Sequence, residues 1–400
     1  MPVEFQKIPE KIAVPGAPNL LRWLIIIVLL TVLGMALSLY LWPTGMSTHT
    51  LWFWLCTLAI PLSAGVLCYA LRLRAYENAR DKVRHWNHLH QVQYDRHMTT
   101  GQRPIGLLGK AYITPNARNK LTAALLANGS QLQSRYFASL QHSLLFASLS
   151  PIKFIISERD YKANLRNYLA ELFHMLEPDL QAAPGGLSVR LQHDGSLDNI
   201  QVGAIWQEIF PATYPVNELV VGTEDDGLMW MDPWLDTRVA TLMLSVEINL
   251  FLEPRQHQAE SVSALLLATP EWLEQHDVVP EVFIHRPVVA TEEMHSVENM
   301  LLWGELQPGE SHTLWRTQIS KEALTQLIQL AEKAGYSPEQ GESYVLDDLF
   351  GHPGVATGNI TLICACEHAV TSGKPQWIMA ENKTVHQAIV RRAECLREIV

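Results

Sequence analysis

One stretch near the C-terminus has residue types that can do acid–base chemistry. It runs from Gly351 to Gly358 with the sequence GHPGVATG, and it precedes an apolar segment, 359–370, that is predicted to be helical. A histidine at a helix start, among small neighbours that let another group approach, can donate a hydrogen bond to a developing oxyanion. His352 is therefore the candidate catalytic residue. The candidate pocket around it consists of Gly351, His352, Gly354, Asp347 and Asp348.

Other signatures of catalysis or cofactor binding are absent from the sequence. There is no GxSxG elbow, HExxH motif, GxGxxG loop or Walker pair. The five cysteines include no CxxC pair, which argues against structural zinc. Cys364 and Cys366 lie in the apolar segment and are predicted to be core residues. We expect no cofactor and no metal site.

The chain resembles the thiolase-like superfamily, in particular the β-ketoacyl synthases. In that family a GHxxGAAG-type segment carries an active-site histidine, and residues 351–358 are similar to it. Gln258–Ala268 looks like the family's GEGAGALVLE-type strand. The helix Ala323–Gly335 with Tyr344–Asp348 looks like the segment leading to a strand end where the family keeps its first histidine. The resemblance covers about residues 180–395 and implies a thiolase-like α/β body.

The departures from that family concern the nucleophile. β-Ketoacyl synthases need a cysteine upstream of the GEG-type strand, but no cysteine lies between Cys68 and Cys364. Asp347 and Asp348 stand roughly where the first histidine is expected. Without a thiolate no acyl-enzyme can form. The resemblance therefore implies a degenerate, inactive relative in which His352 is vestigial.

Strand and helix patterns alternate through the body, residues 104–400, and predict an α/β domain with a parallel or mixed sheet. The predicted strands are 187–192, 218–222, 242–252, 262–268, 281–285 and 344–346. The predicted helices are 116–149 with a break at Gly129, 157–176 ending before Pro178, 199–210, 321–334 and 355–370. No internal repeat is visible in the sequence.

Two apolar runs precede this body, Trp23–Trp42 and Leu51–Leu71. Each has the length of a membrane-spanning helix, about 20 residues, so residues 20–73 are predicted to form a transmembrane hairpin. Lys and Arg residues precede the first run and follow the second, and none lies in the turn between them. Because basic residues favour the cytoplasmic side, both termini are predicted to lie in the cytoplasm of a bacterial inner-membrane protein with two spans. Residues 1–19 are expected to be a flexible tail, and residues 74–103 a juxtamembrane helical stalk and linker.

A third feature is a segment rich in Trp and Met. Such residues are enriched at protein interfaces, so this segment is a candidate partner surface; the alternative is a loop folded onto the sheet. Its members are Met229, Trp230, Met231 and Trp234. The formal net charge of −11 argues against nucleic acid as a partner.

The favoured hypothesis is a membrane-anchored, inactive scaffold or adaptor. His85-Trp86-Asn87 and Arg103–Tyr112 look like membrane-bound accessory proteins of type VI secretion clusters. The expected partners are then the lipid bilayer, other protein subunits or a secreted effector, and a homodimer is an option that the thiolase-like resemblance raises. The alternative is a cysteine-less acyl-thioester enzyme or an acyl-ligand sensor at the membrane.

Overall fold

The computed structural model describes residues 8–43, 46–137, 141–149, 157–224, 227–336 and 341–393. Residue contacts divide the chain into two compact units. An N-terminal unit comprises Val3–Met98, and the body begins at Thr99. Each unit is described by itself.

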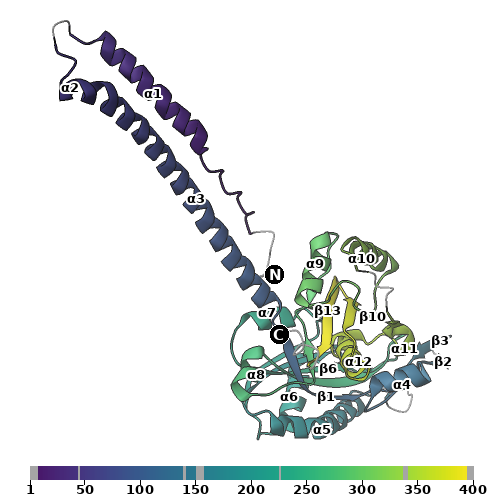
Figure 1. Cartoon of the computed structure of the whole chain (residues 1–400). Coiled ribbons are helices and arrows are strands. Elements are labelled where there is room, and N and C mark those ends of the chain that lie inside the picture. The colour runs from purple at the N-terminus through teal and green to yellow at the C-terminus, as the bar shows by residue number, and fades with distance from the viewer. Residues whose placement is uncertain are drawn as a thin grey trace. The chain divides into compact units, whose positions relative to one another are not determined.

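The N-terminal unit is a pair of antiparallel helices (Figure 1). Gly34 and Gly65 lie where the helices approach closely, because a Cβ at Gly34 would lie 2.5 Å from Cβ of Pro61, and one at Gly65 would lie 3.2 Å from Ile27. The helical segments are α1 (Leu20–Tyr40), α2 (Leu51–Trp54), a π-helical turn (Leu55–Ala59) and α3 (Ile60–Gly101).

The π-helical turn has a local cause in Pro61. Proline has no N–H to donate and its ring crowds the preceding turn, so the ladder is interrupted. The carbonyl of Cys56 accepts a hydrogen bond from Ser38 Oγ of α1, at 3.1 Å. Within the described residues, α1 and the helical segment Leu51–Gly101 are long and apolar enough to cross a membrane by length and composition. Membrane insertion itself stays a prediction.

The tail and the stalk differ in detail from the sequence expectation. The Asn87 side chain accepts a hydrogen bond from the Ile12 N–H and donates one to the Ile12 carbonyl, at 3.0 and 2.9 Å. Lys11 donates to Gln91 at 2.7 Å. This part of the tail therefore lies against α3, and α3 continues without interruption through the stalk to Gly101.

The body is built on one large mixed sheet. Across the sheet the strand order is β11-β10-β12-β13-β8-β1-β7-β6-β4-β5, with β9 beside β13 and a separate hairpin β2–β3. The strands are β1 (Ile105–Ile113), β2 (Gln133–Phe137), β3 (His142–Phe146), β4 (Leu187–His193), β5 (Val216–Gly222), β6 (Leu242–Asn249), β7 (Ser261–Ala268), β8 (Val282–Ile284), β9 (Val288–Val289), β10 (Thr313–Thr317), β11 (Ser343–Val345), β12 (Gln376–Glu381) and β13 (Val385–Arg392).

Helices cover both faces of this sheet. One apolar cluster joins α12 to β1, β7, β8, β10, β12 and β13, and a second joins α5 and α6 to β4, β6 and β7 on the opposite face. The helices are α4 (Leu121–Asn128), α5 (Glu158–Ala182), α6 (Asn199–Ile209), α7 (Met231–Asp236), α8 (Pro270–His276), α9 (Met294–Trp303), α10 (Lys321–Lys333), α11 (Leu346–Leu349) and α12 (Thr357–Ser372).

The sheet consists of two halves with the same topology. In the first half β4 is parallel to β5 and β6, and β7 follows β6 antiparallel. In the second half β10 is parallel to β11 and β12, and β13 follows β12 antiparallel. β1 lies beyond β7 and β8 beyond β13, and the antiparallel pair β1–β8 joins the halves. This structural repeat was not visible in the sequence.

Two sequence expectations about helices were wrong. Among the described residues of the predicted helix 116–149, only residues 121–128 are helical, as α4, while residues 133–137 and 142–146 are the paired strands β2 and β3, with Phe137 and Phe146 packed at a ring distance of 6.0 Å. The spacing of apolar residues there fits both the period of a helix and that of a strand, and packing between the two strands favours the hairpin. Helix α5 begins after the N-cap Ser157 as predicted but passes through Pro178, because Leu176 and Leu180 on either side of it are buried against the sheet.

Candidate functional site

His352 and Asp347 form a hydrogen-bonded pair at the end of the second half of the sheet. Nδ1 of His352 lies 2.8 Å from Oδ1 of Asp347. Oδ2 of Asp347 accepts the backbone N–H of Gln318 at 2.6 Å, which fixes the carboxylate. The His352 side chain is 42% exposed and that of Asp347 is 18% exposed. The hydrogen bond to Asp347 raises the pKa of His352, against an opposing effect of partial burial.

The backbone around His352 is held by a neighbouring segment. The His352 N–H donates to the His257 carbonyl at 2.8 Å, and the Ala259 N–H donates to the His352 carbonyl at 3.1 Å. Gly351 and Gly354 have φ values of +100° and +59°, which favour glycine. A side chain at residue 354 would also meet Asn249. The glycines of the motif therefore serve the turn that presents His352.

The pair opens on a shallow pocket of polar character. Asp347, His352 and Gly354 line it together with Gln258, Gln318, Ile319, Ser320, Glu381 and Asn382. Oε1 of Gln258 is buried and has no hydrogen-bond partner among the described residues. Ser320 is the N-cap of α10, where its Oγ accepts the N–H of Ala323, so it is not positioned as a nucleophile.

The hydrogen-bonded pair of Asp347 and His352 can take up or release a proton. A carboxylate on Nδ1 fixes the orientation of an imidazole and leaves Nε2 to act as a general acid or base. The lining residues include no cysteine. The described residues contain no group of three or more His, Cys, Asp or Glu suited to a metal. The pocket has acid–base groups without a thiol.

Most of the predicted pocket residues come together, with two corrections. Asp347, His352 and Gly354 line the pocket, but Gly351 is buried in the turn and Asp348 is exposed, and neither of these two lines the pocket. His352 also does not lie at the start of α12, because a 3₁₀ turn (Gly354–Ala356) separates them. The prediction that His352 lies at the start of the helix was therefore wrong.

A buried glutamate occupies the N-terminus of α12. Glu247 Oε2 accepts the N–H of Asn359 at 2.7 Å, and its Oε1 lies 2.9 Å from Arg190. Both side chains of the ion pair are less than a tenth exposed. The Arg190 guanidinium lies over the Trp230 ring, 4.9 Å from its centroid. In the sequence, this network is indicated only by a charged residue within each of two apolar strands, Arg190 in β4 and Glu247 in β6.

The cysteines of α12 are far from nucleophilic. Cys364 and Cys366 are fully buried, and burial raises the pKa of both thiols, that of Cys366 to about 12. Cys395 lies outside the described residues. The prediction that Cys364 and Cys366 are core residues agrees with their burial.

The candidate partner surface is mostly interior. Met231 and Trp234 lie in the apolar cluster around α12, with exposed fractions of 0% and 8%. Trp230 stacks on Trp234 at a ring distance of 6.4 Å, and Met229 is half-buried. The alternative, a loop folded onto the sheet, describes this segment, because its aromatic and thioether side chains complete the core.

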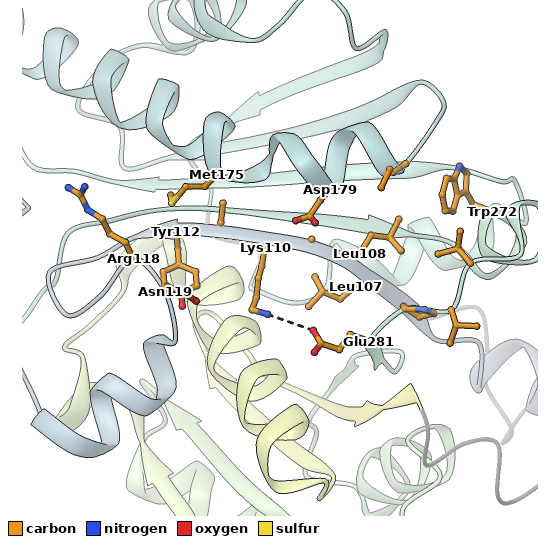
Figure 2. A pocket seen from close by; sticks show the side chains of 17 residues that line it. Leu107, Leu108, Lys110, Tyr112, Arg118, Asn119, Met175, Asp179, Trp272 and Glu281 are labelled. Carbon is orange, nitrogen blue, oxygen red and sulfur yellow. Dashed lines mark ion pairs between the residues drawn. The ribbon is translucent and has the colours of Figure 1, made fainter.

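A separate groove follows β1 (Figure 2). Its volume is about 570 Å³, and it is lined by residues of β1, the end of α5 and residues 278–281. Lys110 and Glu281 face each other across it at 4.0 Å. Partial burial raises the pKa of Asp179, which lies so close to the backbone of Gly109 that a Cβ there would clash with its carboxylate. The groove shares no residue with the His352 pocket.

Comparison with solved structures identifies the architecture. One similar structure is AntDE:AntF, a ketosynthase in complex with its type II polyketide acyl-carrier protein. It superposes with a TM-score of 0.55 at 11% identity, and the match covers 73% of this chain and 100% of that chain. The ketosynthase from module 1 of the bacillaene synthase of Bacillus amyloliquefaciens FZB42 gives 0.53 at 9% identity, covering 73% and 76%. The ishigamide ketosynthase/chain length factor gives 0.51 at 10% identity, covering 73% and 99%.

The fold is ketosynthase-like. This agrees with the thiolase-like α/β body expected from the sequence. No family model and no curated protein matches the sequence. At these identities the likeness shows the fold alone, so function has to be argued from the chain's own residues.

Proposed function

We propose that this protein is a membrane-anchored, catalytically inactive ketosynthase-like scaffold or adaptor at the cytoplasmic face of a bacterial inner membrane. The observation that carries the proposal is an acid–base pocket with no thiol. His352 and Asp347 remain at the pocket, but the chain has no cysteine between Cys68 and Cys364, and Cys364 is buried in a helix interior. Acyl transfer through a thioester intermediate has no nucleophile there.

The anchor is supported by the N-terminal unit. No residue of α1 is buried, although the helix is almost entirely apolar. An exposed surface of that size on a soluble protein would cause aggregation, whereas in a bilayer it is solvated by lipid. Helix α1 is continuous over its 21 residues, so its backbone groups are hydrogen-bonded within the helix, as a spanning segment requires. Alkaline extraction of membranes from the native host should leave the full chain in the pellet; release into the supernatant would contradict the anchor.

Inactivity has a direct measurement. The full chain in detergent, incubated with malonyl and longer acyl thioesters, should gain no acyl mass in intact-protein mass spectrometry. A variant in which all five cysteines are replaced by alanine serves as the control for adventitious thiol chemistry. A stable adduct that survives in this variant would overturn the proposal.

The adaptor role predicts defined protein partners. We expect secretion-system subunits or a cytosolic effector, because the N-terminal sequence resembles accessory proteins of type VI secretion clusters, and because solved ketosynthases such as AntDE:AntF bind an acyl-carrier protein. Cross-linking in native membranes, mild solubilisation and mass spectrometry should recover them. Recovery of this chain alone, or only as a homodimer, would count against the adaptor role.

A second candidate function is favoured by the Asp347–His352 pair. A protonated His352 could donate a hydrogen bond to the thioester oxygen of a malonyl thioester while its C–C bond breaks, CO₂ leaves and the enolate carbon takes a proton to give the acetyl thioester. Release of CO₂ by the wild type that His352→Ala abolishes would support this activity, and no turnover would exclude it. An acyl-ligand sensor differs from both in that acyl thioesters raise the melting temperature without turnover.

A further inference from the structure

Three arginines lie together at one end of the helical hairpin. Arg22 belongs to α1, and Arg72 and Arg74 belong to α3; all three side chains are exposed. The Trp23 and Tyr69 rings contact each other at 5.7 Å, which aligns the two helices at this level. With a rise of about 1.5 Å per residue, the arginines lie within roughly 8 Å of that aromatic contact along the hairpin axis.

We refer to Arg22, Arg72 and Arg74 as the collar. The aromatic contacts indicate the level in the bilayer at which the collar lies. At the opposite end of the hairpin the Trp42 and Phe53 rings meet at 5.0 Å. Between the two contacts lies most of α1, whose 21 residues rise about 31 Å, close to the thickness of a bilayer's hydrocarbon core. Tryptophan and tyrosine favour the headgroup level. The guanidinium groups just outside Trp23 and Tyr69 therefore coincide with lipid phosphates.

The charge of the collar is not neutralised by the protein. Residues 20–76 contain no Asp or Glu. In the part of the chain that the structure describes, none of the three arginines forms an ion pair, whereas Arg80, further along α3, pairs with Asp81 at 3.0 Å. A guanidinium matches a phosphate in geometry and charge.

We propose that Arg22, Arg72 and Arg74 bind anionic phospholipid headgroups and so enrich phosphatidylglycerol around the hairpin. The inference rests on the membrane anchor of the proposed function. It assigns a lipid partner to this end of the hairpin and makes the association dependent on ionic strength.

The test uses the full chain reconstituted in phosphatidylcholine bilayers that contain a spin-labelled lipid. Electron paramagnetic resonance separates lipid held against the protein from bulk lipid, and spin-labelled phosphatidylglycerol is compared with spin-labelled phosphatidylcholine. The wild type should favour phosphatidylglycerol by at least about threefold at low salt. The triple variant Arg22→Gln, Arg72→Gln, Arg74→Gln should lose the preference. The matched control Arg80→Gln, Lys82→Gln, Arg84→Gln removes the same charge further along α3 and should keep it.

The possible outcomes distinguish failure of the lipid-binding proposal for the collar from failure of the membrane-anchor proposal. Protein-held lipid of both kinds without a preference would overturn the collar and leave the anchor standing. No protein-held lipid at all would overturn both. Loss of preference in the control variant alone would place the site elsewhere and contradict the assignment.

Discussion

The two halves of the sheet have the same strand order but different helices after their second strand. In the second half β11 leads through the short helix α11 and a 3₁₀ turn to α12, a buried helix of 16 residues, and this connection carries Asp347 and His352. In the first half β5 leads to α7, a helix of only 6 residues. Arg286 holds α7 in place through Asp232 and Asp236, at 2.6 and 2.8 Å. The acid–base groups thus lie in one half, whereas the corresponding helix of the other half is short and is held by ion pairs to the buried Arg286.

Residues of the first half of the sheet contact the start of α12 in the second half. The start of α12 touches the first half at Gly358, where a Cβ would lie 2.7 Å from the Gly227 carbonyl oxygen. Glu247 and Arg190, both from strands of the first half, complete the helix N-terminus. The first half therefore positions α12 and, through it, the turn with His352.

The largest effect should come from breaking the buried ion pair. Glu247→Leu leaves Arg190 buried without its carboxylate and uncaps α12, so we expect a loss of about 3–5 kcal/mol in the free energy of unfolding. Denaturant unfolding of the solubilised full chain measures it. Glu208→Gln, which breaks the exposed Arg166–Glu208 pair, is the control and should cost less than about 1 kcal/mol. Equal losses in both variants would contradict the supporting role of the pair.

A smaller effect is expected where the halves touch. Gly358→Ala forces α12 away from the Gly227 carbonyl and should cost about 1–3 kcal/mol. Gly203→Ala on α6 has its nearest neighbour 3.8 Å away, so better helix propensity should leave stability unchanged or raised by up to about 1 kcal/mol. Thermal unfolding of the two variants compares them directly. A neutral Gly358→Ala would show that the contact between the halves can relax.

The smallest effect concerns the pH dependence of the Asp347–His352 pair. Because the folded pKa of His352 is raised above its unfolded value of about 6.5, its stabilisation is complete below that pH and is lost as the pH rises through the folded pKa. Asp347→Asn should therefore be less stable than the wild type at pH 6, by less than about 1 kcal/mol since His352 is partly exposed, and the difference should shrink by pH 9. A constant difference across this range would show that the pair does not titrate as a unit.

The sequence anticipated the class of the body and part of its site. Residues 262–268 and 187–192 carry continuous or alternating apolar patterns, and both are strands within a residue or two of the predicted ends. The glycines of residues 351–358 signalled a special turn, and positive φ at Gly351 and Gly354 is the reason for them. What failed was the assignment of His352 to a helix start, because local pattern does not reveal a 3₁₀ turn.

The sequence by itself determined the apolar length of the hairpin, the α/β alternation and the missing cysteine, since these depend on residue types and local periodicity. Only the tertiary structure decided that Asp347 meets His352, that Met231 and Trp234 are interior, and that the sheet is a repeat of two halves. These facts depend on strand order and on contacts between residues far apart in the chain. Glu247 at the N-terminus of α12 is such a contact: 112 positions separate it from Asn359.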